Sequence, residues 1–133
     1  MFAFHTSQLT DRWMSIARLA VTILLLSLVT ASAAQVALDL VLAHPNKYHG
    51  QRVTVRGFAR VDGESFVLYR DVASAKRLDV RALSVAQRRN RPLHDQLNNR
   101  WVIATGVVDA KAHGLWGFPC ELLLEEAYAV RHQ

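Results

Sequence analysis

The fold is decided by the stretch QRVTVRGFARV, residues 51–61. Small or apolar side chains stand at every second position from Val53 to Val61, and charged, polar or aromatic side chains stand between them. This period-two alternation predicts a strand with one buried and one exposed face. Asp62-Gly63 follows and predicts a hairpin turn. The next segment, ESFVLYR at 64–70, is rich in aromatic and β-branched residues and predicts the returning strand.

Three further strands are predicted downstream, which makes five in all. The fourth is expected at 100–108, RWVIATGVV, and the fifth at 120–131, CELLLEEAYAVR, with the loop DAKAHGLWGFP between them. The third is expected at 77–83, RLDVRAL, and alternate side chains in it should point inward: Leu78, Val80 and Ala82.

Two short helices are also predicted. Residues 36–44, VALDLVLAH, carry apolar side chains at helical spacing before a proline that ends the helix, and these are Leu38, Val41 and Leu42. Residues 46–50 are then expected to form a turn. The segment SVAQ at 84–87 has capping-box spacing, so a helix is expected to begin there and to continue through QRRNR until Pro92. Residues 93–99 are expected to be a loop.

Matched glycines indicate how these strands are arranged. The pattern V-x-V-x-G-x-A from Val53 is repeated as V-x-A-x-G-x-V from Val102, which puts Gly57 and Gly106 on inward faces. A mid-strand glycine suits a sharp bend or the close approach of another backbone. The pattern favours a small closed barrel over two unrelated strands with incidental glycines. The fold class is therefore mainly β, a five-stranded OB-fold-like barrel with a leading helix and a helix between strands three and four. An SH3-like barrel is the alternative.

The segment 38–69 resembles a pattern of small exported bacterial OB-fold-like proteins, most of which are uncharacterised. In these a short helix leads to P-x-x-Y-x-G-x-x-V-x-V-x-G and then to a strand that ends in Leu-Tyr. The matching positions are Pro45, Tyr48, Gly50, Val53, Val55, Gly57, Leu68 and Tyr69. The resemblance covers about a third of the expected domain, and it implies a fold but no defined activity.

The N-terminal segment predicts export. An apolar run from Leu19 to Val29 precedes Ala31-Ser32-Ala33, an A-x-A cleavage site, and Ser32-Ala33-Ala34 also fits. Residues 1–34 are therefore expected to be a signal peptide, and Met14 offers a second start. Residues 35–133 would form a single periplasmic or secreted domain.

A retained membrane anchor is the alternative to cleavage. The twenty residues between Arg18 and Asp39 carry no charge, so residues 19–38 are long enough to span a bilayer. The small and polar residues TASAAQ at the end of this run favour cleavage. A lipoprotein is excluded because no cysteine stands directly after the apolar run.

The net charge limits the classes of ligand that the domain is expected to bind. Without residues 1–34 the chain has 14 basic and 10 acidic side chains, a net charge of +4. This balance favours anionic lipid or polysaccharide as partners, or merely keeps the domain soluble. Export disfavours nucleic acid.

Cys120 is the single cysteine, so no internal disulfide is expected. Burial is its expected state, because the apolar run LLL follows closely.

The outer face of the first strand carries the strongest binding hypothesis. Arginines interleaved with an aromatic ring can hold phosphate or sulfate groups while the ring stacks on the ligand. The alternative is a solvated face with Phe58 covered by the leading helix. The loop HGLWGFP adds rings that either form a binding tip or plug the barrel end. The candidate ligand-binding residues are Arg52, Arg56, Phe58, Arg60, Tyr69, Arg81, Trp116 and Phe118.

The other groups of charged residues, histidines and the cysteine do not form a recognisable catalytic or metal-binding pattern. Arg88, Arg89 and Arg91 are expected at an exposed helix end. Five histidines and one cysteine follow residue 34, but none has the spacing of a zinc motif. Glu125 and Glu126 are adjacent and would face opposite sides of a strand. We therefore expect no metal, no cofactor and no enzymatic activity.

Three functions remain open. The first is a non-enzymatic binding module for an anionic or amphipathic ligand in the periplasm or outside the cell. The second is an envelope structural or interaction protein that docks on a protein partner through a strand edge or the Trp116 loop. A membrane-anchored OB module that binds nucleic acid is a distant third.

Overall fold

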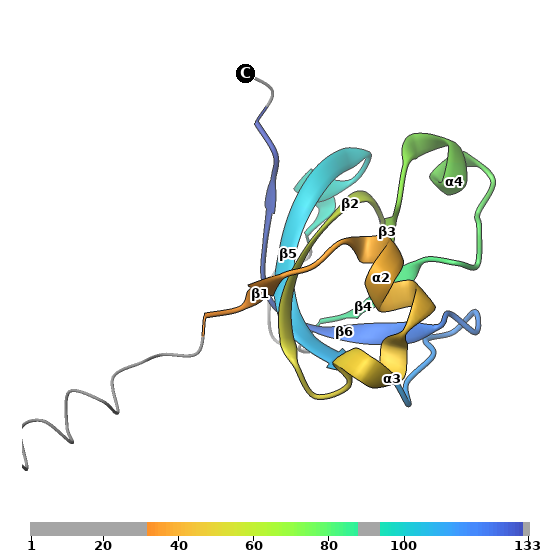
Figure 1. Cartoon of the computed structure of the whole chain (residues 1–133). Coiled ribbons are helices and arrows are strands. Elements are labelled where there is room, and N and C mark those ends of the chain that lie inside the picture. The colour runs from red at the N-terminus through yellow and green to blue at the C-terminus, as the bar shows by residue number, and fades with distance from the viewer. Residues whose placement is uncertain (1–31, 88–93, 132–133) are drawn as a thin grey trace, which may run out of the picture. The chain divides into compact units, whose positions relative to one another are not determined.

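The computed structural model describes residues 32–87 and 94–131. The chain divides into two units at Ser32, and the unit from Ala33 onward is described here by itself. It is mainly β (Figure 1). The strands are β1 Ala34–Gln35, β2 Arg52–Asp62, β3 Ser65–Tyr69, β4 Leu83–Ala86, β5 Arg100–Asp109 and β6 Cys120–Ala129. The helices are α2 Leu38–Ala43, α3 Pro45–Tyr48, α4 Val72–Lys76 and the 3-10 helix η1 Asp95–Leu97.

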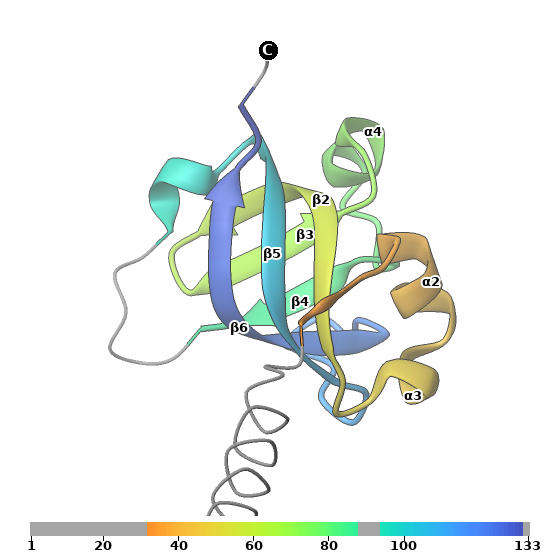
Figure 2. The ribbon, with the colours of Figure 1, turned by 60° about the vertical axis from the view of Figure 1, so that its left-hand side comes forward.

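The six strands form one mixed sheet whose pairings close into a ring. Neighbouring strands follow the order β1-β2-β3-β4-β6-β5, and β2 also pairs with β5. The pairing of β4 with β6 is parallel, and the other pairings within the ring are antiparallel. β1 is added outside the ring as a short parallel neighbour of β2, with Ala34 opposite Val53. Figure 2 shows β2, β5 and β6 side by side on one face.

The strand and hairpin predicted around residues 51–70 are confirmed. Asp62 pairs with Ser65, which leaves Gly63 and Glu64 as the two turn residues, one position later than predicted. Gly63 has a φ of +54°, in the left-handed region that such hairpin turns favour. The fourth and fifth predicted strands correspond to β5 and β6.

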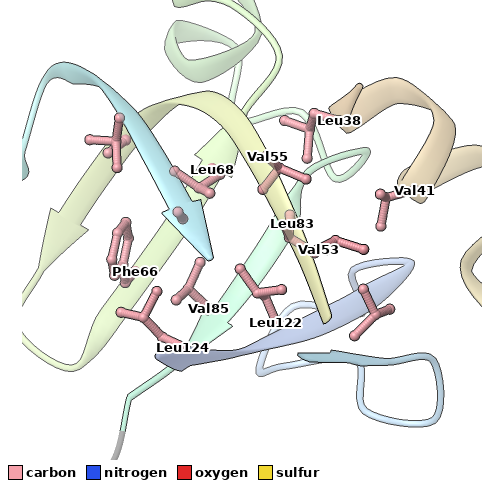
Figure 3. Close-up of a cluster of buried hydrophobic side chains, with 14 of the residues drawn as sticks. Leu38, Val41, Val53, Val55, Phe66, Leu68, Leu83, Val85, Leu122 and Leu124 are labelled. Carbon is pink, nitrogen blue, oxygen red and sulfur yellow. The ribbon is translucent and has the colours of Figure 1, made fainter. Parts of the chain in front are cut away.

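The core lies inside the ring. The inward side chains of β2 are buried as the alternation predicts, and they meet those of the other strands (Figure 3). The leading helix is confirmed as α2, which buries Leu38, Val41 and Leu42 against this core. The prediction of a turn at residues 46–50 is wrong in part, because α3 takes up Pro45–Tyr48. Proline at the first position suits a helix start, since that residue needs no N–H donor.

Both matched glycines lie where backbones come close. A Cβ on Gly106 would meet the carbonyl oxygen of Leu123 at 2.3 Å, and the β5–β6 register shifts at this point. A Cβ on Gly57 would stand 3.1 Å from the Cβ of Leu68 and from the carbonyl oxygen of Tyr69. The prediction that these glycines permit close backbone approach is confirmed.

The third predicted strand, 77–83, is wrong. Leu78 and Val80 are exposed rather than inward, and only Ala82 is buried. α4 precedes this segment, since Asp71 accepts a hydrogen bond from the backbone N–H of Ser74 at 2.6 Å and caps the helix. This bond also holds the pKa of Asp71 below its usual value. The strand begins only at Leu83, where pairing with β3 and β6 is available.

The helix predicted from residue 84 is also wrong where the structure describes it. Ser84 to Ala86 lie in β4, so long-range pairing overrides the local capping-box spacing. The rest of that prediction, including Arg88, Arg89 and Arg91, lies outside the described residues. In the described part of the connection to β5, the helical turn is η1.

The export prediction also concerns residues that are not described. The apolar run that underlies both the predicted signal peptide and the alternative anchor lies within residues 1–31. Within residues 32–87 and 94–131, no helix is both long and apolar enough to cross a bilayer.

The ring closure predicts a graded cost of adding methyl groups at the two glycines. Gly106→Ala should lower the free energy of unfolding by about 3 kcal/mol, because the new Cβ would overlap a backbone oxygen that cannot rotate away. Gly57→Ala should cost about 1 kcal/mol, because its contacts are tight but not overlapping. Urea unfolding of both variants measures the difference. An equal cost at the two positions would contradict the close approach at Gly106.

Candidate ligand-binding groove

The structure divides the predicted binding face of β2 into two halves. Along one edge β2 pairs with β3, which places Tyr69 beside Phe58 and Val67 beside Arg60. Along the other edge β2 pairs with β5, which places Trp101 beside Phe58. Phe58 therefore lies at the boundary, and the two sides of it have different surroundings.

The β3 half is covered. Six side chains, each at most 9% exposed, form a second hydrophobic cluster on the outer side of the ring: Phe58, Val67, Tyr69, Ala75, Ala82 and Phe118. Ala75 comes from α4, so α4 and the β5–β6 loop cover this half, whereas the sequence suggested the leading helix. Burial raises the pKa of the Tyr69 hydroxyl above its usual value. Tyr69 and Phe118, two of the predicted ligand residues, pack in this cluster.

The β5 half is open and carries an ordered aromatic and cationic group. The rings of Phe58 and Trp101 meet edge to face, with centroids 5.8 Å apart and planes at 74°. The guanidinium carbon of Arg56 lies 5.0 Å from the centre of the Trp101 ring. Such a stack restrains the arginine while its N–H groups remain able to bind an anion.

A groove runs from this group around the end of β6. We call it the Trp101 groove. Its walls are tied to the sheet, because the Asn99 N–H donates to the carbonyl oxygen of Ala59 at 2.9 Å and the Val130 N–H donates to that of Trp101 at 2.8 Å. It is an open depression of about 1160 Å³. Its lining is Phe58, Gln96, Leu97, Asn99, Arg100, Trp101, Ala127, Tyr128, Ala129, Val130 and Arg131.

The charge of the Trp101 groove has one sign. Arg100 and Arg131 are exposed and line it, and Arg56 stands over its central ring. The described lining residues include no carboxylate, histidine or cysteine. Two guanidinium groups therefore line the groove, together with three aromatic rings, and the guanidinium group of Arg56 lies over one of these rings. This set is suited to holding an anion.

The other predicted ligand residues lie elsewhere. Arg52 stands at the beginning of β2 and forms an ion pair with Glu125 at 2.6 Å. Arg60 is exposed on the covered side, where its charge acts on Tyr69. Arg81 and Trp116 are exposed in the loops before β4 and between β5 and β6. The residues predicted to form a single binding face are thus distributed between the open half of β2, its covered half and the loops.

Sequence reasoning missed Arg100, Trp101, Tyr128 and Arg131 as groove residues. The alternation in RWVIATGVV places Trp101 outward, so the signal for an exposed ring was present. The pairing of β2 with β5 puts this ring beside Phe58. That pairing joins segments about 40 residues apart, and local patterns do not specify it.

No protein-family model matches this chain, and no curated protein matches it. Solved structures with some similarity include a Leishmania major Friedlin protein described as an aspartyl-tRNA synthetase. It shares 12% sequence identity with this chain, and the match covers 80% of this chain with a TM-score of 0.48. This chain spans only 22% of that synthetase chain.

Two OBody proteins bound to hen egg-white lysozyme are also similar. OBody AM3L15 has 16% identity and a TM-score of 0.43, and OBody AM3L09 has 19% identity and a TM-score of 0.45. Each comparison covers 65% of this chain, and the OBody chains are covered to 87% and 88% respectively.

Potential reactive groups lie outside the Trp101 groove. Among the described residues, no three histidine, cysteine or carboxylate side chains gather as a metal site. Cys120 is buried as predicted, and burial raises the pKa of its thiol to about 11. The thiolate, which is the reactive form, is therefore scarce at neutral pH.

The burial of Cys120 predicts that it resists thiol reagents. In native buffer at about pH 8, a chromogenic disulfide reagent should react with the folded protein more than about a hundredfold slower than with the chain in urea, because both access and ionisation are suppressed. Absorbance of the released thiolate measures the two rates. Equal rates in native buffer and in urea would show that Cys120 is accessible.

Proposed function

We propose that the closed ring is an OB-type barrel. Its support is the connectivity: five strands, β2 to β6, close in the order β2-β3-β4-β6-β5, as in a small Greek-key barrel. Two features differ from the sequence-based expectation, since α4 lies between β3 and β4 and β1 adds a sixth strand outside the ring.

We further propose that this barrel is a non-enzymatic binding module, periplasmic or secreted, that holds an anionic ligand in the Trp101 groove. Export rests on the predicted signal peptide at residues 1–34. Of the two predicted cleavage sites, the one after Ala33 would leave both residues of β1 on the exported domain, whereas the one after Ala34 would leave only Gln35. The ligand class that fits is a polysaccharide chain bearing carboxylate or sulfate groups.

The observation that carries this proposal is the stack of Arg56 on Trp101, with Trp101 itself held against Phe58. A flexible exposed arginine loses side-chain entropy when it binds an anion. Stacking removes part of that freedom in advance, so more of the interaction energy contributes to affinity. Tyr128 is half exposed beside this stack and offers a second ring to the apolar face of a sugar.

The width of the groove supports an extended ligand. Arg56 on β2 and Arg131 beyond the end of β6 are separated by β5, so the cations spread across three strands. A chain with repeated charges can contact several of them at once, and each contact adds to the salt dependence of binding.

The proposal is tested on heparin as a model polysulfated chain. Arg56→Gln combined with Arg100→Gln should weaken binding about tenfold at low ionic strength, because two charge-assisted contacts are lost. The matched control is Lys47→Gln combined with Lys111→Gln, which removes the same net charge away from the groove. Affinity chromatography and calorimetry at several salt concentrations measure the effect.

Two outcomes would contradict this function. Equal weakening by the groove pair and the lysine pair would mean that heparin responds only to net charge. Unchanged affinity of the Tyr128→Ala variant, together with an unchanged salt slope of the arginine pair, would mean that the ligand bypasses the groove.

A further inference from the structure

The most exposed large apolar side chains gather on two loops. Among the described residues, the four highest exposures are those of Leu115 at 87%, Trp116 at 70%, Leu78 at 68% and Val80 at 61%. Leu78 and Val80 lie between α4 and β4, and Leu115 and Trp116 lie between β5 and β6. We call these four residues the apolar tip.

The two loops of the apolar tip are neighbours. Phe118, at the end of one loop, packs in the same cluster as Ala82, at the end of the other. Gly114 approaches Ser84 so closely that a Cβ would meet the serine Oγ at 2.6 Å. The four apolar side chains therefore project from adjoining segments.

The loop that carries Trp116 is held in a defined shape. The Phe118 N–H donates to the carbonyl oxygen of His113 at 2.8 Å, and the His113 Nδ1 lies 3.0 Å from the Phe118 carbonyl oxygen. Gly114 and Gly117 have φ values of +60° and +72°, so each takes a conformation that glycine adopts without strain. Leu115 and Trp116 therefore lie exposed between two glycines with positive φ, in a loop whose end is anchored by the buried ring of Phe118.

Leu78 has neither a buried nor a relaxed position. Its φ is +52°, in the left-handed region that disfavours a bulky side chain, and its side chain faces solvent. Asparagine or glycine would suit this backbone better. About two-thirds of this leucine is exposed in the isolated domain, and it would bury further apolar area on contact with an apolar phase.

Basic residues flank the apolar tip in the sequence. From Arg70 to Arg81 there are four basic and two acidic side chains, and the loop at 110–119 adds Lys111 and no acid. Both acids are engaged locally, since Asp71 caps α4 and Asp79 accepts from the Arg81 N–H at 3.0 Å. The cations nearest in sequence to the tip residues are Lys76, Arg77 and Arg81, and all three are exposed.

We propose that the apolar tip, with Lys76, Arg77 and Arg81, docks on a bilayer that contains anionic phospholipid. Tryptophan and leucine enter the boundary between head groups and acyl chains, while arginine and lysine stay with the phosphates. A basic rim is attracted by the negative surface of such a bilayer. A second copy of this chain fits less well, because a twofold contact through the tip would bring two basic rims together.

This docking surface is separate from the Trp101 groove. None of its seven residues lines the groove, and Arg56 and Trp101 lie on strands rather than on these loops. Failure of polysaccharide binding would therefore leave the lipid contact unaffected, and failure of lipid binding would leave the groove unaffected.

The environment of Trp116 tests the proposal. In the full chain, Trp13→Phe and Trp101→Phe leave Trp116 as the single tryptophan. Mixed phosphatidylglycerol and phosphatidylcholine vesicles should shift its emission to shorter wavelength, and lipids brominated on the acyl chain should quench it. Residues 1–34 carry an apolar run that can itself enter lipid, so the readout is Trp116 rather than sedimentation.

Matched variants assign the contact to the tip. Arg77→Gln with Arg81→Gln, and separately Leu78→Ser with Leu115→Ser, should each raise the lipid concentration needed for half-maximal quenching about tenfold. The controls are Arg56→Gln with Arg100→Gln for charge, and Leu40→Ser with Leu123→Ser for exposed apolar area. Circular dichroism checks that each variant folds. High salt and pure phosphatidylcholine vesicles, which need no variant, should also abolish the quenching.

Three results would overturn the proposal. The first is an unchanged Trp116 emission in anionic vesicles. The second is equal loss of quenching in the control pairs, which would show a nonspecific contact. The third is a shift that grows with protein concentration without lipid, which would show that the tip binds another copy of the chain.

Discussion

The antiparallel pairing of β2 with β5 is the constraint on which the rest of the structure depends. Without it the strands would form an open sheet with two exposed edges. With it, the inward residues of β2 and β5 face the same interior and the core closes around them. The pairing runs from Arg52 opposite Val107 to Ala59 opposite Arg100, and Gly57 and Gly106 both lie within it. Gly106 also leaves room for the carbonyl oxygen of Leu123 on β6, at the point where the β5–β6 register shifts.

The same pairing creates the candidate binding surface. Because side chains alternate along each strand, burying Val53 and Val55 forces Arg56 and Phe58 outward. β5 then supplies Trp101 opposite Phe58 on that outer face. The core and the group formed by Arg56, Phe58 and Trp101 therefore lie on opposite sides of the same pair of strands. A shift of one residue would bury Arg56 and expose the core at once.

Local sequence patterns were sufficient to predict the structure of segments whose alternating apolar and polar residues decide which face is buried. β2, its hairpin with β3, α2, β5 and β6 could all be predicted, and so could the close backbone approach at both glycines. The segment 77–86 could not. Leu78, Val80 and Ala82 alternate like a strand, but the strand forms at Leu83–Ala86, where β3 and β6 both offer partners. Ser84 shows the same effect, since its capping-box spacing is real but pairing with β6 prevails.

The sequence predicted which kinds of residue form the candidate site, but it did not predict where on the fold the site lies. Arg56 and Phe58 could be identified because alternation alone sets them outward, whereas Trp101 and Tyr128 join them through pairings distant in the chain. Tyr69 and Phe118 were expected at the ligand, but α4 and its following loop turn their surface into a second core.

Covering that surface has a consequence for the proposed lipid contact. The segment between β3 and β4 that buries Tyr69 also carries Leu78, Val80 and Arg81 to the outside, beside the loop that holds Trp116. The strand face is thus buried under α4, whereas the loops expose large apolar side chains, with basic residues close by in the sequence. The buried cluster beneath gives these loops a firm base, since Phe118 and Ala82 anchor one loop each. A surface built in this way can change its exposed residues without disturbing the ring, because the core inside β2 to β6 shares none of them.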